Sequence, residues 1–228
     1  MENPNEEFSG SHAKKRPKNP IKFKIHLNDE QKEAKAVILS NDITVLKGGA
    51  GSGKTLLAVQ VALDLLFNRE IEKIVICRPT VSKEEIGYLP GDISEKLSPW
   101  LSPIYSNLYM LYDSEKIDKL VDDQKIEIVP FAFMRGRTFT NSCVIADECQ
   151  NVTNSQMEMV IGRLGKGSKM ILCGDTTQID LKSKKDSGLD FLKIIEANVP
   201  GFKIVTLKKN HRHEIVQKIL DVYSEYTD

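Results

Sequence analysis

Residues 48 to 55 constrain the fold of this chain more than any other stretch. They read Gly-Gly-Ala-Gly-Ser-Gly-Lys-Thr, which fits the pattern G-x-x-x-x-G-K-[ST]. An apolar, strand-like run at residues 43–46 precedes them, and a segment of helical composition without Gly or Pro follows at residues 56–66. A strand, a glycine-rich turn and a helix in this order predict a loop that holds a phosphate group.

Each residue type in the loop has a physical role. Glycines let the backbone turn its N–H groups toward a phosphate, since a Cβ would obstruct that approach, and the helix N-terminus attracts the same anion. We expect Lys54 to reach the β and γ oxygens and the Thr55 hydroxyl to ligate Mg²⁺. The predicted nucleotide-binding residues of the loop are Gly48, Gly49, Ala50, Gly51, Ser52, Gly53, Lys54 and Thr55.

A second signal is the pair Asp147-Glu148, which ends the apolar run 142–146. Alone this pattern is weak, but it gains weight downstream of a phosphate-binding loop. The first carboxylate suits a Mg²⁺ ligand and the second suits polarising an attacking water. We therefore predict Asp147 as a metal ligand with Thr55, and Glu148 as a catalytic residue.

Polar residues follow three other strand-like runs, at the strand ends where ligands bind in open parallel sheets. Asp175 and Gln178 come after residues 169–173 and are expected to sense the γ-phosphate. Arg78 ends the run 72–77; it contacts a phosphate or forms a surface salt bridge. Arg135 and Arg137 flank a glycine after the run 125–129. They form a phosphate site or pair with nearby carboxylates.

Gln31 and Arg212 each have two interpretations. Gln31 lies three residues after Asn28, as in a capping box, and it also lies one helix upstream of the loop, where its amide could read the edges of adenine. Arg212 lies in the basic segment 208–213. It is either an arginine finger, which contacts the phosphates of the nucleotide, or part of a basic surface turn.

Composition limits which classes of protein this chain can belong to. The chain has 228 residues with 32 basic and 32 acidic side chains, so no overall field attracts nucleic acid or membrane. No apolar run is long enough for a membrane span, and the N-terminus lacks a secretory core segment. We expect a disordered tail at 1–20, whose basic cluster 11–18 is a solvated arm or a nucleic-acid contact, and one domain at 21–228. Four widely spaced cysteines predict buried reduced thiols and a cytoplasmic protein.

Together these motifs resemble the PhoH-like family of ATPases, which is close to the nucleotide-binding core of superfamily 1 helicases. The resemblance covers about residues 27–223 in family order. Its specific blocks are Leu89-Pro90-Gly91-Asp92 and Arg135-Gly136-Arg137-Thr138, and it departs from the family pattern at Cys149 and at Asn210-His211. It implies ATP and Mg²⁺ as cofactors, ATP hydrolysis, and a role with RNA or another nucleic acid.

The expected fold is α/β: a single P-loop NTPase (RecA-like) core with a mostly parallel sheet of five or six strands and helices on both faces. The expected mechanism is in-line attack of water on the γ-phosphorus, with Lys54, Glu148, Gln178 and Arg212 as catalytic residues. The predicted activity is an ATPase stimulated by single-stranded nucleic acid, RNA before DNA, with a helicase as one candidate. The alternative is a slow, nucleotide-gated regulatory or binding module.

Oligomeric state follows from the presence of one core. A superfamily 1 helicase places ATP between two such cores, whereas this chain has one. We therefore predict a ring-like homo-oligomer, with a hexamer as one candidate, in which Arg135, Arg137 or Arg212 acts in trans. No membrane partner is expected.

Overall fold

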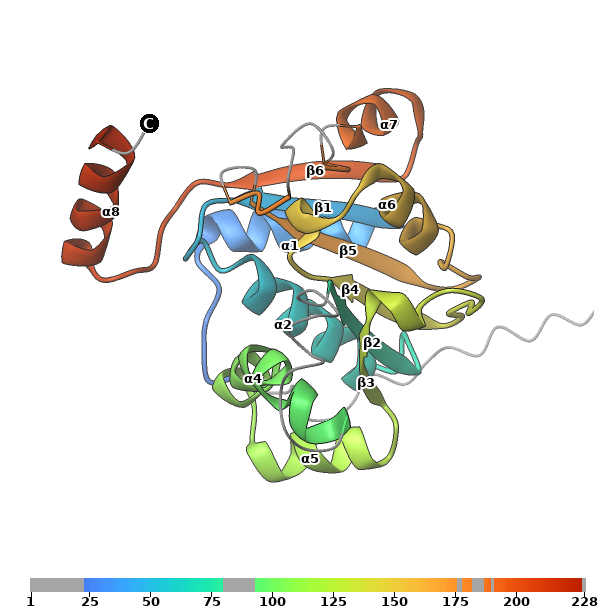
Figure 1. The fold of residues 1–228 in the computed structure, drawn as a ribbon. Coiled ribbons are helices and arrows are strands. Elements are labelled where there is room, and N and C mark those ends of the chain that lie inside the picture. The colour runs from blue at the N-terminus through green and yellow to red at the C-terminus, as the bar shows by residue number, and fades with distance from the viewer. Residues whose placement is uncertain (1–22, 80–92, 176–177, 182–186, 190, 227–228) are drawn as a thin grey trace, which may run out of the picture.

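The computed structural model describes residues 23–79, 93–175, 178–181, 187–189 and 191–226. The basic cluster 11–18 and the block 89–92, both singled out in the sequence, lie outside these residues. Figure 1 shows one sheet with helices on both sides and a last helix that stands away from the body. Strands and helices alternate along the chain, as the sequence predicts.

Six strands form one open sheet in which every pairing is parallel, with the order β3-β2-β4-β5-β1-β6. This confirms the predicted fold class. The strands are β1 (Ile43–Gly48), β2 (Lys73–Arg78), β3 (Ile126–Pro130), β4 (Ser142–Ala146), β5 (Lys169–Gly174) and β6 (Phe202–Leu207). The carboxyl ends of β4, β5 and β1 are therefore neighbours, because these strands are adjacent and parallel.

Helices cover both faces. One face carries α1 (Asp29–Ser40), α2 (Lys54–Phe67), α4 (Ile93–Leu111) and α5 (Ser114–Asp122), and the other carries α6 (Asn154–Ile161) and α7 (Leu192–Asn198). Two short 3₁₀ turns, Phe131–Phe133 and Cys149–Asn151, follow β3 and β4. The helix α8 (Glu214–Tyr226) comes last.

The strands divide their side chains between two cores. In β4, Cys143 and Ile145 pack toward α2, whereas Val144 and Ala146 pack toward α6. This is the two-residue period of a strand, here with both faces apolar because both are covered. The four cysteines are buried free thiols, as predicted, and burial raises the pKa of Cys143 to about 12. They are therefore packing residues.

α7 begins at Leu192, after a buried stretch at 187–189. The aromatic residues of α4 are held by packing: the indole N–H of Trp100 donates to the Pro79 carbonyl at 3.0 Å, and the rings of Tyr105 and Tyr109 lie 5.8 Å apart. Among the described helices, none is both long enough and apolar enough to cross a membrane.

Candidate functional site

A pocket of about 340 Å³ opens at the carboxyl edge of the sheet. The register aligns Lys47 with Gly174, so the ends of β1 and β5 lie side by side, and β4 ends next to β5. Ten residues predicted from sequence line the pocket: Ala50, Gly51, Gly53, Lys54, Thr55, Asp147, Glu148, Asp175, Gln178 and Arg212. Residues far apart in the chain are thus brought to one place, as expected because ligands bind at the carboxyl ends of parallel strands.

The glycine-rich loop has the backbone its sequence requires. Gly51 and Gly53 have φ values of +85° and +79°, a region that favours glycine. Space is also short, since a Cβ on Gly51 would lie 2.6 Å from the Arg212 side chain. Lys54 bends back over the loop, and its ammonium donates to the carbonyls of Gly48 at 2.6 Å and Gly49 at 3.0 Å. This lysine is therefore positioned within the phosphate-binding turn.

Thr55 and Asp147 form the candidate metal site. The Thr55 hydroxyl donates to the Asp147 Oδ1 at 2.8 Å, across 92 residues of sequence. Asp147 is buried, and burial with the nearby Glu148 charge raises the pKa of its carboxyl. A hydroxyl and a carboxylate oxygen are hard donors of the kind that Mg²⁺ takes together with phosphate oxygens and water. The residues present therefore fit the ion.

Glu148 occupies an unusual backbone position beside this pair. Its φ is 56°, in the left-handed region, which costs a non-glycine residue roughly 1–3 kcal/mol. Two neighbours hold its carboxylate: the Gln150 amide donates to Oε2 at 2.6 Å, and Arg78 lies 3.4 Å from Oε1. Arg78 therefore makes an ion pair with Glu148 at the pocket, and Glu148 is aimed by its surroundings.

Gln150 is a site residue whose role the sequence reasoning missed. It is buried, and its side-chain carbonyl accepts the backbone N–H of Asp175 at 3.1 Å while its amide holds Glu148. It thus links the ends of β4 and β5. The signal was the Asp-Glu-Cys-Gln motif itself, but a bridging role needs knowledge that these strands are adjacent. Asn107 of α4 also lines the pocket, and the sequence reasoning missed it as well.

Gln31 performs its capping role and also faces the loop. Its backbone N–H donates to Asn28 Oδ1 at 2.9 Å, and its side-chain oxygen accepts the Asn28 N–H at 3.2 Å. The remaining amide nitrogen is directed at the loop, since a Cβ on Gly53 would lie 2.8 Å from it. Gln31 does not line the pocket, but its amide nitrogen borders the glycine turn.

A strap formed by residues 208–212 joins β6 to α8 and crosses the loop. The Glu30 carboxylate accepts the backbone N–H groups of Lys208 at 2.7 Å and Lys209 at 3.1 Å, and the His211 N–H donates to the Gly51 carbonyl at 3.0 Å. Arg212 follows directly and lines the pocket of its own chain. It was offered from sequence as an arginine acting in trans, but its position suits action in cis.

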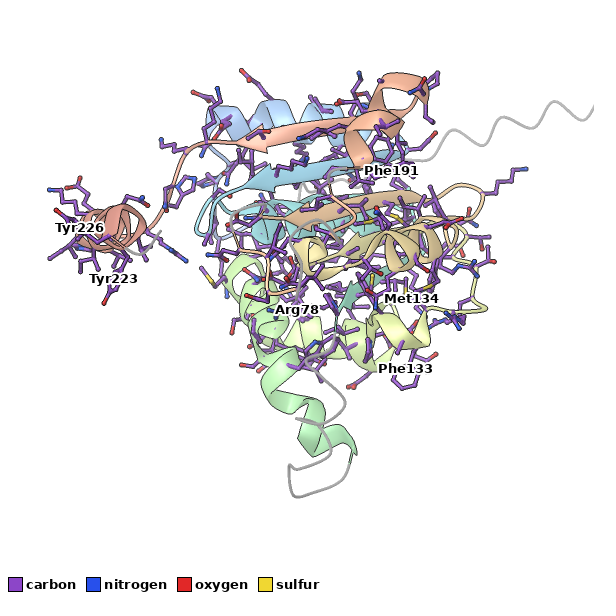
Figure 2. The ribbon with its side chains drawn as sticks, turned by 45° about the horizontal axis from the view of Figure 1, so that its top comes forward. Arg78, Phe133, Met134, Phe191, Tyr223 and Tyr226 are labelled. Carbon is purple, nitrogen blue, oxygen red and sulfur yellow. The ribbon has the colours of Figure 1, made fainter. Side chains whose placement is uncertain are left out.

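The Arg-Gly-Arg turn after β3 separates its two arginines. Arg137 makes a two-pronged ion pair with Glu127, at 2.7 and 2.8 Å, and its guanidinium lies 4.7 Å from the Phe139 ring centroid. The Arg137 and Lys73 charges lower the pKa of Glu127 to about 2. Arg137 is therefore structural, whereas Arg135 is exposed. In Figure 2, Phe133 points outward beside this turn and Met134 points inward.

The fold and the site define a P-loop nucleotide-binding protein. The family model described as PhoH-like protein matches residues 25–224, and the chain belongs to this family. It is 43% identical over 196 residues to a PhoH-like protein of Synechocystis sp. and 42% identical over 198 residues to one of Bacillus subtilis, covering 85% and 86% of this chain. It spans 60% and 62% of the lengths of those relatives.

A solved structure shares the fold at low sequence identity. The large terminase of the thermophilic bacteriophage D6E matches with a TM-score of 0.51 at 10% identity, over 86% of this chain and 50% of that chain. This likeness concerns the arrangement of the sheet and its helices alone. The family membership rests on the sequence matches.

Proposed function

We propose that this chain binds ATP with Mg²⁺ and hydrolyses it, and that single-stranded nucleic acid, RNA before DNA, stimulates the hydrolysis in a homo-oligomer. The observation that carries the proposal is the 2.8 Å contact of Thr55 with Asp147 beside Glu148, at the mouth of a glycine-rich loop. A hydroxyl, two carboxylates and a lysine at one strand edge match the needs of phosphoryl transfer to water.

The chain's own residues divide the work. The loop amides and Lys54 bind and orient the β and γ phosphates, and Glu148 accepts the proton of a water aligned with the γ-phosphorus. Thr55 and Asp147 would hold Mg²⁺, which neutralises the charge that develops on the phosphate oxygens. Gln178 and Asp175 border the γ-phosphate position, and Arg212 adds a positive charge from the strap.

Nucleic-acid contact is proposed for the turn after β3. Phe133 has 63% of its surface exposed, and the exposed Arg135 is two residues away. An aromatic ring beside a guanidinium suits a stacked base and its phosphate. This turn lies at the same edge of the sheet as the nucleotide pocket, so both ligands would lie on one side of the molecule.

The test is ATP turnover with and without single-stranded RNA and DNA. Glu148→Gln should keep ATP affinity and lose about 10²-fold or more in turnover, whereas Lys54→Ala should weaken binding itself. Phe133→Ala with Arg135→Ala should keep the basal rate and lose the stimulation, with exposed Lys116→Ala as the matched control. A slow rate indifferent to either polymer would favour the nucleotide-gated module, and unchanged turnover in Glu148→Gln would refute the catalytic assignment.

A further inference from the structure

The helix α8 exposes an apolar face to solvent. In Figures 1 and 2 it stands apart from the body, joined to it by an extended segment. Five of its large apolar side chains are between 49% and 81% exposed: Ile215, Ile219, Val222, Tyr223 and Tyr226. At 100° per residue they fall in one arc of the helix, with Val216 and Leu220 beside them, while Glu214, Gln217 and Lys218 fall in the opposite arc. The helix is thus built to pack against an apolar surface.

A helix of this length is only marginally stable on its own. Its 13 residues lie near the limit below which isolated helices are marginal in water. Most helical stability in proteins comes from burying the apolar face. The family match extends to residue 224 and so includes most of α8. α8 is therefore part of the family's domain. A packing partner is therefore required.

That partner is not the body of the same chain. The strap fixes the chain to the body as far as Arg212, through Glu30 and the Gly51 carbonyl, and His213 alone lies between Arg212 and α8. The side chain of Asn210 also bonds to Gln217 in the helix. The orientation of α8 is therefore set by the strap, and its apolar side chains are exposed and do not pack on its own sheet.

A second apolar patch lies elsewhere on the chain. Phe191 just before α7, Ile194 within it and Val199 just after it are 52%, 58% and 47% exposed. Leu192 of α7 is fully buried. α7 packs on β6, and α8 lies beyond the carboxyl end of that strand and the whole strap (Figure 1). The two patches are thus on separate parts of one molecule, so α8 of one copy can contact α7 of a second copy.

We propose that α8 docks on the α7 face of a second copy, in a head-to-tail contact. The inference deepens the homo-oligomer of the proposed function by naming both sides of its interface. Identical contacts of this kind close into a ring or continue as a filament. The ten half-exposed side chains of the two patches represent on the order of 1,000 Å² of apolar surface, and flanking contacts would bring the total into the range of specific interfaces. Because α8 is rooted at Arg212, this interface adjoins the nucleotide pocket.

The experiment measures mass by light scattering after size exclusion, over a dilution series of the full chain. The wild type should be an oligomer of the 25.7 kDa protomer. The double variant Ile219→Asp with Tyr223→Asp should be monomeric, and so should Ile194→Asp. Lys218→Asp places the same residue on the polar face of α8 and should keep the wild-type mass. ATP affinity, expected to match the wild type, shows that the body of each variant is folded, and circular dichroism should lose no more than the helical signal of α8.

Mixing the two monomeric variants is the decisive step. The first keeps an intact α7 and the second an intact α8, so the mixture has one productive contact and should form a dimer and nothing larger. A monomeric wild type, a mixture that stays monomeric, or Ile194→Asp with wild-type mass would each overturn the proposal; the last would show that α8 pairs elsewhere. None of these readouts depends on hydrolysis, so failure here is separate from failure of the ATPase assignment.

Discussion

The side-chain amide of Gln150 donates to the Glu148 carboxylate at 2.6 Å, while the Gln150 carbonyl accepts the Asp175 backbone N–H at 3.1 Å. One buried side chain thus fixes the candidate catalytic carboxylate to the end of the neighbouring strand. Gln150 is a positioning residue, because it acts through Glu148.

Gln150→Glu should lower ATP turnover about 10-fold or more while ATP affinity changes little. The new carboxylate cannot donate to Glu148, and repulsion between the two raises the pKa of the pair. The pH–rate profile for turnover should therefore shift to higher pH, which a purely structural defect would not cause. Gln124→Glu, the same change at an exposed position, should leave the profile unchanged. A lower rate without a shifted profile would contradict the positioning role.

Gln31→Glu separates two roles of one residue. A glutamate oxygen still accepts the Asn28 N–H, so the capping box of α1 survives, but the amide donor that faces Gly53 is lost. If that donor reads adenine, preference for ATP over GTP should fall by about tenfold, or about 1.4 kcal/mol, with little change in thermal stability. Binding by calorimetry with both nucleotides measures this.

Gln156→Glu is the matched control for that experiment. Gln156 has the same position in the capping box of α6, with Thr153 as its cap, and it does not line the pocket. Its substitution should leave both nucleotide affinities unchanged. Equal nucleotide preference in Gln31→Glu and the wild type would leave Gln31 with capping alone.

The sequence was enough to predict the sheet and the loop, because these depend on local pattern, and to place Thr55 near Asp147, because both follow strands of one parallel sheet. Apolar runs with turn residues between them specify strands, and parallel strand ends gather at one edge. The order of the strands is a tertiary property, and no local pattern reports it. Roles that depend on that order, such as Gln150 bridging β4 and β5, therefore appear only in the structure.

The strap and α8 show a second limit. Residues 214–226 form an amphipathic helix, yet its apolar face is exposed in the single chain. Helical periodicity shows that an apolar face needs a packing partner, but it does not identify that partner. Likewise, the segment 208–213 reads as a basic turn, whereas its backbone bonds to Glu30 and Gly51 place Arg212 at its own pocket.

Arg212→Ala should lower turnover by about tenfold or more, because a charge beside the phosphates is lost. The position in cis predicts that mixing this variant with Lys54→Ala restores no activity, since each copy is defective in its own pocket. Lys209→Ala should behave as the wild type, because the backbone of Lys209 makes its bond to Glu30. Recovery of ATPase activity in the mixture would mean that the arginine of one copy serves the pocket of another.

Glu127 supplies a pH-dependent part of the stability. Its carboxylate pairs with Arg137 at 2.7 Å and Lys73 at 2.6 Å, and its pKa falls from an ordinary 4.5 to about 2. Because the folded-state pKa is the lower one, the ion pairs stabilise the fold fully above the unfolded pKa, and this contribution is lost as pH falls toward 2. The side chain is partly exposed, so we expect Glu127→Gln to cost about 1–2 kcal/mol near pH 7.

Urea unfolding of the wild type and Glu127→Gln at several pH values checks this. The difference in unfolding free energy should be constant from neutral pH down to about 5 and then shrink as the wild-type carboxylate becomes protonated in the unfolded and then the folded state. Asp29→Asn removes an exposed ion pair with Lys32 and should leave stability close to that of the wild type throughout. A difference between wild type and Glu127→Gln that persists undiminished at the acid end would mean that Glu127 contributes packing and neutral hydrogen bonds in place of charge.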